Sequence, residues 1–255
     1  MLEISKLTKD FNGLRAVNDL DFSIQPGTIN ALIGPNGASK TTVFNLITGF
    51  LPFQSGEIVF NNQQVNKLPA FQISRLGISR TFQNIRLFPQ ISVMENMLLA
   101  MKYPKGEKLL SAILRSNEML SEDEQNRKQA LDSLEFVGLI EKQDELAENL
   151  SHGQRRLLEL ARTLATDADL FLFDEPTCGV FPEMRQKILK IISSLKEQGK
   201  TILFIEHDMK VLMDISDNII VLNFGKKIAE GEPGDIIKNN AVIEAYLSKG
   251  RAGAA

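Results

Sequence analysis

Apolar and polar residues alternate along the N-terminal part of the chain. The apolar positions lie on both sides of Asn12-Gly13 and are Leu2, Ile4, Leu7, Val17, Leu20, Phe22 and Ile24. Alternation with a period of two is typical of a strand with one buried face, and Asn-Gly is a hairpin turn signal. The pattern therefore predicts antiparallel strands over residues 2–24, which Pro26-Gly27 closes, and a further exposed hairpin over Glu57–Val65.

Four short runs are apolar at nearly every position. They are Ile29–Ile33, Leu170–Phe173, Thr201–Ile205 and Ile219–Leu222. Such runs are typical of strands that are buried on both faces of a parallel sheet. A helical pattern over Met184–Leu195 separates the second run from the third, as expected for a crossover between parallel strands. The pattern predicts an α/β protein with a mainly parallel sheet.

From about residue 85 to 165 the pattern is helical. Two segments there match the capping box, Ser92-Val-Met-Glu95 and Ser121-Glu-Asp-Glu124, and each predicts the start of a helix. The second helix is expected to end at Gly138. Its expected inward-facing positions are Leu131 and Leu134. We therefore predict an inserted α-helical subdomain over residues 85–165.

Composition excludes several classes of protein. The chain has 255 residues, a single cysteine and a formal net charge of −3. One cysteine excludes an intrachain disulfide, and the Cys and His spacing does not match a structural zinc site, so a reducing compartment is expected. Scattered charge gives no reason to expect a nucleic-acid partner. We find neither a signal peptide nor a membrane-spanning apolar run, so any membrane connection is expected to go through another subunit.

A glycine-rich loop, Gly34-Pro-Asn-Gly-Ala-Ser-Lys-Thr-Thr42, joins the first buried run to an apolar helix expected over Val43–Leu51. Backbone N–H groups and the dipole at a helix N-terminus favour an anion. In the nucleotide-binding interpretation, Lys40 reaches the β- and γ-phosphates and the Thr41 hydroxyl binds Mg²⁺. The simpler alternative is a glycine turn that ends a strand. The expected nucleotide-binding residues of the loop are Asn36, Gly37, Ala38, Ser39, Lys40, Thr41 and Thr42.

Ser39 departs from the phosphate-loop pattern, which has glycine before the lysine. The backbone approaches phosphate closely at that position, so a side chain is expected to crowd the β-phosphate or to tilt Lys40. Alternatively, the hydroxyl adds a hydrogen-bond donor. We predict weaker nucleotide binding or slower hydrolysis with folding intact.

Two carboxylates, Asp174 and Glu175, follow the buried run Leu170–Phe173. Open α/β sheets place ligand chemistry at the carboxyl ends of their strands. Asp174 suits direct or indirect binding of Mg²⁺, and Glu175 suits polarising an attacking water. The alternative is an acidic turn that Pro176 ends, and the nearby phosphate loop disfavours it.

The segment Leu150-Ser-His-Gly-Gln154 opens a helix, and on its own Ser151 reads as an N-cap. Together with the phosphate loop, Phe171-Leu-Phe-Asp-Glu-Pro176 and Glu206-His-Asp208, in this order and spacing, it resembles the ATP-binding-cassette (ABC) ATPases over nearly the whole chain. The resemblance implies one domain over 1–250 with a P-loop NTPase core and an antiparallel β part. The core is expected at 1–84 and 166–250, the helical subdomain at 85–165 and a flexible tail at 251–255.

The resemblance also implies roles for single residues. Gln83 is similar to the loop glutamine that senses Mg²⁺ and the membrane subunit, and His207 to the histidine that contacts the γ-phosphate. Phe11 stands where this family stacks an aromatic ring on adenine. A hairpin core position remains the alternative for Phe11, and a structural role the alternative for His207.

The family resemblance further implies that two subunits close head to tail around ATP. Each ATP then lies between the Lys40 loop of one chain and the helix start of the other, whose nucleotide-binding residues are Ser151, Gly153 and Gln154. The segment after Thr177 is a second departure, because Phe181 stands where many relatives have Asn or Asp. Either coupling between subunits is altered there, or the aromatic ring strengthens dimer packing.

Met94, Met97 and Met101 recur at helical spacing. Such a stripe is usually ordinary core. The alternative is that these methionines, with Leu87, Phe88 and Pro89, line a groove for a helix of a membrane partner.

The segments 80–96, 205–209 and 242–247 look most similar to the subunits that energise bacterial uptake of branched-chain amino acids and related amides. The resemblance implies a cytoplasmic Mg²⁺-dependent ATPase, peripheral on the inner face of the membrane, with permease partners and without direct membrane insertion. Three alternatives remain open: a hydrolysis-poor partner in a heterodimer, an ATPase acting on nucleic acid or ribosomes, and a subunit of a lipid or lipopolysaccharide exporter. The basic extensions usual in the second class are missing here.

Overall fold

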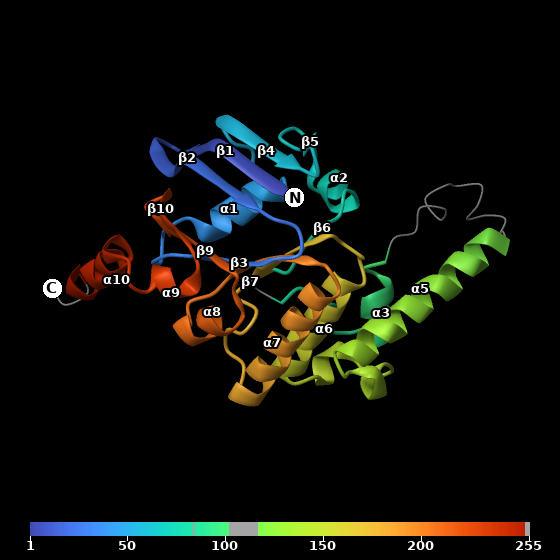
Figure 1. Cartoon of the computed structure of the whole chain (residues 1–255). Helices are drawn as coiled ribbons and strands as arrows, with labels where there is room; N and C mark the ends of the chain where they lie inside the picture. Colours follow the sequence, from blue (N-terminus) through green and yellow to red (C-terminus); the bar gives the residue numbers. More distant parts are fainter. Residues whose placement is uncertain (84, 102–116, 253–255) are drawn as a thin grey trace. The chain divides into compact units, whose positions relative to one another are not determined.

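The computed structural model describes residues 1–83, 85–101 and 117–252, and contacts divide the chain into two units (Figure 1). Unit 1 comprises Met1–Arg80, Ala168–Cys178 and Ile192–Ala255. Unit 2 comprises Thr81–Asp167 and Gly179–Ile191, so it includes the whole segment 85–165 for which the sequence predicts a helical subdomain.

Unit 1 contains an antiparallel sheet with the strand order β2-β1-β4-β5. Its strands are β1 (Leu2–Phe11), β2 (Leu14–Ile24), β4 (Ser55–Phe60) and β5 (Gln63–Gln64). Asn12 and Gly13 both have positive φ angles, of 46° and 89°, as a tight hairpin turn requires. The predicted N-terminal hairpin is therefore confirmed, and so is the second hairpin.

A second sheet of unit 1 has the strand order β10-β9-β3-β8-β7-β6. Its strands are β3 (Ile29–Ile33), β6 (Ile78–Arg80), β7 (Leu170–Asp174), β8 (Thr201–Ile205), β9 (Asn218–Asn223) and β10 (Lys226–Gly231). Neighbours from β9 to β6 pair in parallel, and β10 pairs with β9 in antiparallel fashion. Every residue of β3, β7 and β8 is buried, which confirms the prediction of parallel strands covered on both faces.

The helices of unit 1 begin with α1 (Lys40–Ile47), whose Phe44 and Ile47 are fully buried in the core with residues of both sheets. The sequence placed this helix at Val43–Leu51. It starts earlier because the phosphate loop leads directly into its first turn, and it ends earlier because Gly49 adopts a left-handed conformation with φ 70°. The other helices are α2 (Ala70–Arg75), α8 (Met209–Ile215), α9 (Pro233–Ile236) and α10 (Asn240–Ala252).

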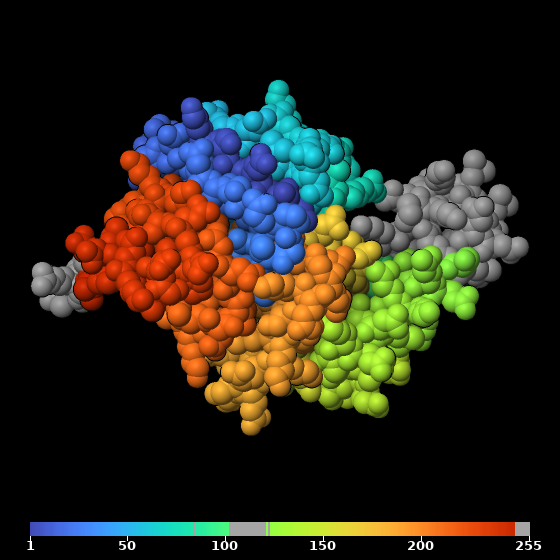
Figure 2. Space-filling view, viewed as in Figure 1, coloured from blue at the N-terminus to red at the C-terminus, as the bar shows by residue number. Residues whose placement is uncertain are grey.

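Helix α10 extends into the segment predicted as a flexible tail, and it includes Arg251 and Ala252. Residues 253–255 lie outside the described residues. Elsewhere in unit 1, the β9–β10 turn lies against β2, where the amide of Asn18 donates to the carbonyl of Gly225 at 2.9 Å. Figure 2 shows the N-terminal strands (blue) and the β10–α10 region (orange to red) side by side on the visible face.

Unit 2 contains α3 (Val93–Leu98), α5 (Asn117–Phe136), two short 3₁₀ segments, α6 (His152–Leu164) and part of α7 (Pro182–Glu197). The 3₁₀ segments span Ile140–Lys142 and Ala147–Asn149. The predicted capping box at Ser92 is confirmed, because Ser92 Oγ accepts from the Glu95 amide and the Glu95 carboxylate accepts from the Ser92 amide.

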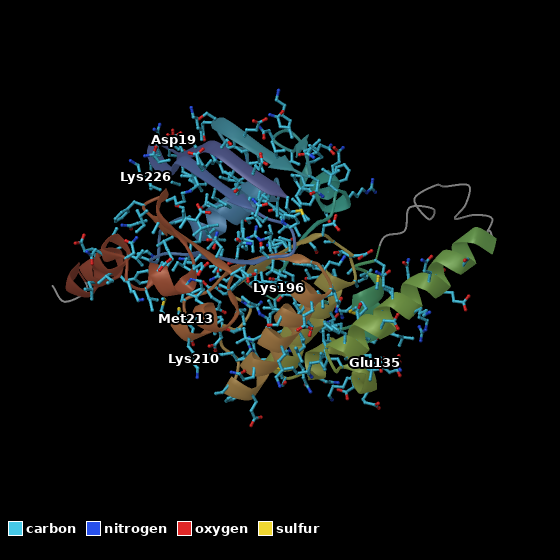
Figure 3. All side chains as sticks on the ribbon, viewed as in Figure 1. Asp19, Glu135, Lys196, Lys210, Met213 and Lys226 are labelled. Atoms are coloured by element: carbon cyan, nitrogen blue, oxygen red, sulfur yellow. The ribbon has the colours of Figure 1, made fainter. Side chains whose placement is uncertain are left out.

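The second predicted capping box is wrong, because Ser121 lies inside α5. The preceding residues Asn117–Leu120 contain no helix breaker, so the helix starts upstream of the serine. The expected end is confirmed, since Gly138 has φ 66° just after Phe136. Leu134 is fully buried as expected, and Leu131 is half-buried. The neighbouring Glu135 is exposed and points outward (Figure 3).

Met94, Met97 and Met101 are all buried within unit 2. The interpretation of the methionine stripe as core is therefore confirmed. Phe88, which the alternative placed in a docking groove, is exposed, with 53% of its surface accessible, so a partner contact of Phe88 stays a prediction.

Candidate functional site

The loop between β3 and α1 wraps tightly because glycine occupies its first position. Gly34 has φ 150°, and a Cβ there would lie 2.1 Å from the carbonyl oxygen of Leu222 on β9. The loop then turns through a hydrogen bond from the Ala38 amide to the Pro35 carbonyl at 3.0 Å. Only glycine therefore lets the chain leave β3 in this direction.

Lys40 is the first residue of α1, and its side chain folds back over the loop. It is buried, and its Nζ donates to the carbonyl oxygens of Gly34 at 2.7 Å and Pro35 at 3.2 Å. The first turn of α1 contains no acidic residue. The ammonium and the N-terminus of α1 together form an electropositive cradle suited to a polyphosphate.

Ser39 is the N-cap residue of α1 and adopts a left-handed conformation with φ 73° and ψ 22°. Within the part of the chain that the structure describes, its side chain makes no capping hydrogen bond. The left-handed region costs a non-glycine residue about 1 to 2 kcal/mol, so this backbone explains why the phosphate-loop pattern has glycine here. Motif spacing alone pointed to crowding of a phosphate and did not reveal the backbone strain.

Asp174 and Glu175 lie at the carboxyl end of β7. Asp174 is fully buried and accepts a hydrogen bond from Arg80 of β6 at 2.9 Å. Glu175 has a left-handed φ of 51°, and its amide donates to the carbonyl of Ile205 at the end of β8 at 3.0 Å. This contact turns the chain across the end of β8 directly after the buried aspartate.

His207 follows β8 and contacts the predicted catalytic glutamate. Its Nε2 lies 2.9 Å from Glu175 Oε1, and 40% of the histidine side chain is exposed. The intervening Glu206 is buried and accepts hydrogen bonds from the Thr177 hydroxyl at 2.5 Å and the Thr177 amide at 3.1 Å. Glu206 therefore fixes the turn that carries Glu175 next to the segment that carries His207.

The phosphate loop, Asp174, Glu175 and His207 come together for a topological reason. They follow β3, β7 and β8, which are adjacent parallel strands, so their carboxyl ends meet at one edge of the sheet. The edge combines a buried cation, a buried carboxylate and a carboxylate–imidazole pair. This set can bind a polyphosphate and polarise a water molecule.

The same edge offers oxygen donors for Mg²⁺. Thr41 lies on the first turn of α1, and Asp174 is buried at the end of β7. Among residues 1–83, 85–101 and 117–252, no group of three or more His, Cys, Asp and Glu side chains is arranged to hold a metal ion. The two donors fit Mg²⁺, which proteins usually hold through one or two side-chain oxygens together with substrate phosphates and water.

Phe11 ends β1 and is 40% exposed, so the alternative of a hairpin core position is wrong. Lys9 Nζ lies 4.8 Å from the centroid of the Phe11 ring. This cation–π contact is a further reason for the aromatic residue at this position. A half-exposed ring still offers a flat surface for a base.

The remaining expected site residues belong to unit 2. Ser151 caps α6: its Oγ accepts from the Gln154 amide at 3.3 Å, and Gln154 Oε1 accepts from the Ser151 amide at 2.8 Å. At Gly153, an added Cβ would lie 3.1 Å from Cγ of Met184 on α7. Gln83 is exposed. Local capping and packing account for these residue types, and their contact with a nucleotide stays a prediction.

Sequence reasoning missed two residues that organise the site. Arg80 binds Asp174, and Glu206 binds Thr177. The sequence gives little signal for Arg80, because β6 has three residues and only Ile78 is apolar. Glu206 lies directly after the buried strand β8, where an acidic residue requires a partner.

A glycine-rich loop with a buried lysine, beside two carboxylates at the ends of adjacent parallel strands, defines a P-loop nucleotide-binding site. The family model for ABC transporters matches residues 17–178. The chain therefore belongs to the ABC transporter family, and it is an ATP-binding cassette ATPase. The fold class and the family expected from the sequence are both confirmed.

Relatives match the chain along nearly its whole length. The high-affinity branched-chain amino acid transport ATP-binding protein LivG of Escherichia coli (strain K12) is 40% identical over 250 residues, which are 98% of each chain. A probable LivG protein of Archaeoglobus fulgidus is 38% identical over 247 residues, which are 97% of this chain and 95% of the relative. The similarity therefore includes both units.

Two solved structures are also similar. One is a nucleotide-free ATP-binding cassette from an ABC transporter, with a TM-score of 0.84 and 31% sequence identity. The match covers 96% of this chain and 98% of the cassette. Another is the ADP conformation of MJ1267, an ATP-binding cassette of an ABC transporter, with a TM-score of 0.82 and 30% sequence identity. The match covers 97% of this chain and 98% of MJ1267. Among the described residues of our chain, no helix has the length and apolar character needed to cross a bilayer.

Proposed function

We propose that this chain is the Mg²⁺-dependent ATPase subunit of an importer for branched-chain amino acids or related amides. The relatives at 38% to 40% identity are branched-chain amino acid transport proteins, one of them assigned as probable, and this supports the solute class. The observation that carries the ATPase role is the pair of Glu175 and His207, 2.9 Å apart, at the same sheet edge as the Lys40 loop. Solute movement itself is assigned to separate permease subunits, with this chain on the cytoplasmic face.

Each residue at the sheet edge has a defined task in this proposal. Lys40 exchanges its contacts with the loop carbonyls for contacts with the β- and γ-phosphates, and the first amides of α1 add donors. Thr41 and Asp174 hold Mg²⁺, with Gln83 as a further contact. Bound Mg²⁺ offsets the negative charge of the phosphates.

Glu175 orients the attacking water, and His207 holds the glutamate in place and contacts the γ-phosphate. The 2.9 Å contact between Nε2 and Oε1 supports this pairing. The left-handed backbone of Glu175 directs the chain back toward β8. Strain of this kind is common at catalytic residues, where the surrounding contacts hold the unusual conformation.

The active assembly is proposed to contain a second cassette subunit, either a copy of this chain or a related chain. A dimeric ABC cassette structure supports this, with a TM-score of 0.75 at 25% identity. The N-terminus of α6, with Ser151, Gly153 and Gln154, then supplies donors to the γ-phosphate of the ATP bound by the other subunit. Gln83 and the segment after it are assigned to permease contact.

Replacement of Glu175 by glutamine tests the catalytic assignment. Glu175→Gln keeps the size of the side chain and removes the base, so ATP turnover is expected to fall at least about 100-fold while ATP affinity stays within about twofold. Phosphate release and binding of a fluorescent ATP analogue measure the two quantities. Glu183→Gln, in the first turn of α7, is the matched control. Unchanged turnover in Glu175→Gln would show that another residue orients the water.

The solute class needs its own experiment. The chain is co-expressed with its cognate permeases in cells that lack branched-chain amino acid uptake, and entry of labelled leucine, isoleucine and valine is measured. Uptake is expected with the wild-type chain and is expected to be lost with Lys40→Ala. Uptake that does not depend on Lys40 would contradict the proposed function.

A second candidate function has one specific observation in its favour. The strained Ser39 in the phosphate loop supports a hydrolysis-poor subunit that binds nucleotide and pairs with a more active relative. Turnover measured for the purified chain alone and mixed with a paired cassette distinguishes the two. Turnover that appears only in the mixture, and that survives Glu175→Gln in this chain, would favour the second candidate.

A further inference from the structure

Arg80 ends β6, and 5% of its side chain is exposed. Its Nη2 donates to Asp174 Oδ2 at 2.9 Å, while its Nη1 donates to Asn45 Oδ1 at 2.7 Å. Nη1 also lies 3.3 Å from the Thr48 hydroxyl. One guanidinium therefore contacts acceptors on two different elements, β7 and α1.

These two elements carry the proposed Mg²⁺ donors. Asp174 is the last residue of β7, and Thr41 is on the first turn of α1. Asn45 follows Thr41 by one helical turn, so both residues lie on the same side of α1. Arg80 thus links the proposed carboxylate donor to the part of the helix that carries the proposed hydroxyl donor.

The chemistry of arginine matters for this link. The guanidinium is planar and presents several donors in a fixed fork, whereas a lysine ammonium is a point charge on a flexible stem. The carbon at the centre of the guanidinium lies 5.3 Å from the ring centroid of Phe44, a fully buried residue of α1. This cation–π contact is a further constraint on the position of the guanidinium beside α1.

Charge gives a second reason for Arg80. Asp174 has no solvent-exposed surface, and a buried carboxylate is costly unless a positive group pairs with it. The guanidinium supplies that positive charge at 2.9 Å from Asp174 Oδ2. The ion pair therefore restricts the orientation of the carboxylate.

We propose that Arg80 is a positioning residue for Mg²⁺-nucleotide binding, because it holds Asp174 in register with the Thr41 end of α1. The inference rests on the proposed function and adds a residue to that site. Arg80 itself does not contact the metal ion or the phosphates. Loss of Arg80 is therefore expected to weaken nucleotide binding in the presence of Mg²⁺. Nucleotide binding in the absence of Mg²⁺ is expected to change very little.

The test measures the Kd of a fluorescent ATP analogue for the full chain in excess Mg²⁺ and in EDTA. Arg80→Lys keeps the positive charge and loses the fork. Its Kd in Mg²⁺ is expected to rise about tenfold, whereas its Kd in EDTA is expected to change less than about twofold. A merely structural role would shift both constants equally, so equal shifts, or no shift, would overturn the inference.

A second variant, Asn45→Ala, tests the same link and can be used if Arg80→Lys does not fold. Asn45→Ala leaves the ion pair between Arg80 and Asp174 intact and removes the main contact with α1. Its Kd in Mg²⁺ is expected to rise about threefold with little change in EDTA, because only one of two links is lost. An unchanged ratio of the two constants in Asn45→Ala counts against the inference.

Arg15→Lys is the matched control, because Arg15 also pairs with an aspartate, Asp10, at 3.0 Å, but with 55% of the arginine side chain exposed. Neither Kd is expected to change in this variant. The experiment also separates two kinds of failure. A wild-type chain that does not bind the analogue in either buffer would contradict the proposed function itself, whereas normal wild-type binding with an unaffected Arg80→Lys would contradict only the role of Arg80.

Discussion

At the residue scale, two non-glycine residues of the proposed ATP site have left-handed backbone conformations. Ser39 has φ 73° and Glu175 has φ 51°. Hydrogen bonds hold both in place: the amide of Val43 donates to the Ser39 carbonyl at 3.0 Å, and the Glu175 amide donates to Ile205. Strain that the surrounding structure enforces is common at functional sites, and it makes both positions sensitive to substitution.

Replacement of Ser39 by glycine is expected to raise both stability and nucleotide affinity. Relief of the left-handed strain stabilises the folded chain by about 1 to 2 kcal/mol. The greater conformational freedom of glycine in the unfolded chain reduces this gain by up to about 1 kcal/mol. The net gain in the free energy of unfolding is therefore expected to be about 0.5 kcal/mol. Denaturant unfolding measures the stability, and binding of a fluorescent ATP analogue measures the affinity.

Asn62→Gly is the control for this prediction. Asn62 also has a positive φ, of 63°, but it lies in the turn between β4 and β5. Its replacement is expected to leave nucleotide affinity unchanged. If Ser39→Gly altered neither affinity nor turnover, the serine would be a neutral substitution in the phosphate loop.

The residues that the sequence could identify are those to which we assign the chemistry. Lys40, Asp174 and Glu175 stand in recognisable patterns because their position relative to a strand end or helix start is local in sequence. Arg80 and Glu206 act through partners that are far away in sequence, Asp174 and Thr177. A single sequence contains no signal for such pairs beyond the presence of a charge next to a buried run.

At the element scale, α6 binds the segment that contains Gln83. Arg156 Nη1 donates to the carbonyl of Phe82 at 3.1 Å, and Glu159 Oε1 accepts from the Phe82 amide at 3.3 Å. One turn later, Arg162 Nη1 donates to the carbonyl of Arg86 at 2.5 Å. Both ends of the segment 82–86 are therefore attached to the helix that Ser151 caps.

Burial has the largest effect on the pKa values of Glu159 and Arg162 of α6. Arg156 and Glu159 pair at 2.7 Å, with 6% of each side chain exposed. Loss of hydration nevertheless raises the pKa of Glu159 above its ordinary value of 4.5, and attraction by Arg156 only partly opposes this. Loss of hydration likewise lowers the pKa of Arg162. The folded protein therefore disfavours ionised Glu159 relative to the unfolded chain.

This pKa shift predicts a pH dependence with a definite sign. Because the folded pKa of Glu159 is the higher one, its contribution to stability is fully present below the unfolded pKa and is lost as pH rises through the folded pKa. In Glu159→Gln this dependence is absent. The free energy of unfolding of the wild type, relative to that of the variant, is expected to fall as pH rises from 4.5, the ordinary value, toward neutrality. Urea unfolding at several pH values measures the difference.

Glu95→Gln provides a control of opposite sign. The amide and hydroxyl of Ser92 donate to the Glu95 carboxylate and lower its pKa. Its contribution to stability is therefore present above the unfolded pKa and lost as pH falls through the folded pKa. If wild type and Glu159→Gln had parallel pH profiles, the paired arginine would compensate the burial of Glu159 completely.

Element type followed from the sequence more reliably than element boundaries. The buried strands β3, β7 and β8 were evident because nearly every position in them is apolar. The start of α5 was misplaced because a serine with a glutamate three residues later is also acceptable inside an exposed helix. The three-residue strand β6 was not recognised, since hydrophobic periodicity needs a longer segment to be visible.

At the scale of the whole molecule, the sequence predicted parallel strands but not their order. In the sheet, β3 lies between β8 and β9, although more than 160 residues separate it from β8 along the chain. This arrangement depends on packing of distant segments, which hydrophobic periodicity does not encode. The order matters for function because it places the loops after β3, β8 and β7 at neighbouring positions on one edge.

The loop before α7 is a candidate for a contact between subunits, because its aromatic residue, Phe181, is exposed in the single chain. Phe181 has 85% of its surface accessible, so burial within its own unit does not explain it. Its backbone carbonyl accepts from the Arg185 amide at 3.0 Å, which keeps the start of α7 in place whatever the side chain. An exposed aromatic ring on a fixed backbone is well suited to packing against a partner subunit.

Replacement of Phe181 by alanine is therefore expected to weaken ATP-dependent dimer formation without affecting the single chain. The Glu175→Gln background keeps ATP intact, and sedimentation equilibrium with ATP gives the dimer Kd, which is expected to rise about tenfold when a buried aromatic contact is lost. Phe224→Ala, at a residue with 75% of its surface accessible in the β9–β10 turn, is the matched control and is expected to leave the Kd unchanged. Equal dimer constants for all three proteins would place Phe181 outside the subunit interface.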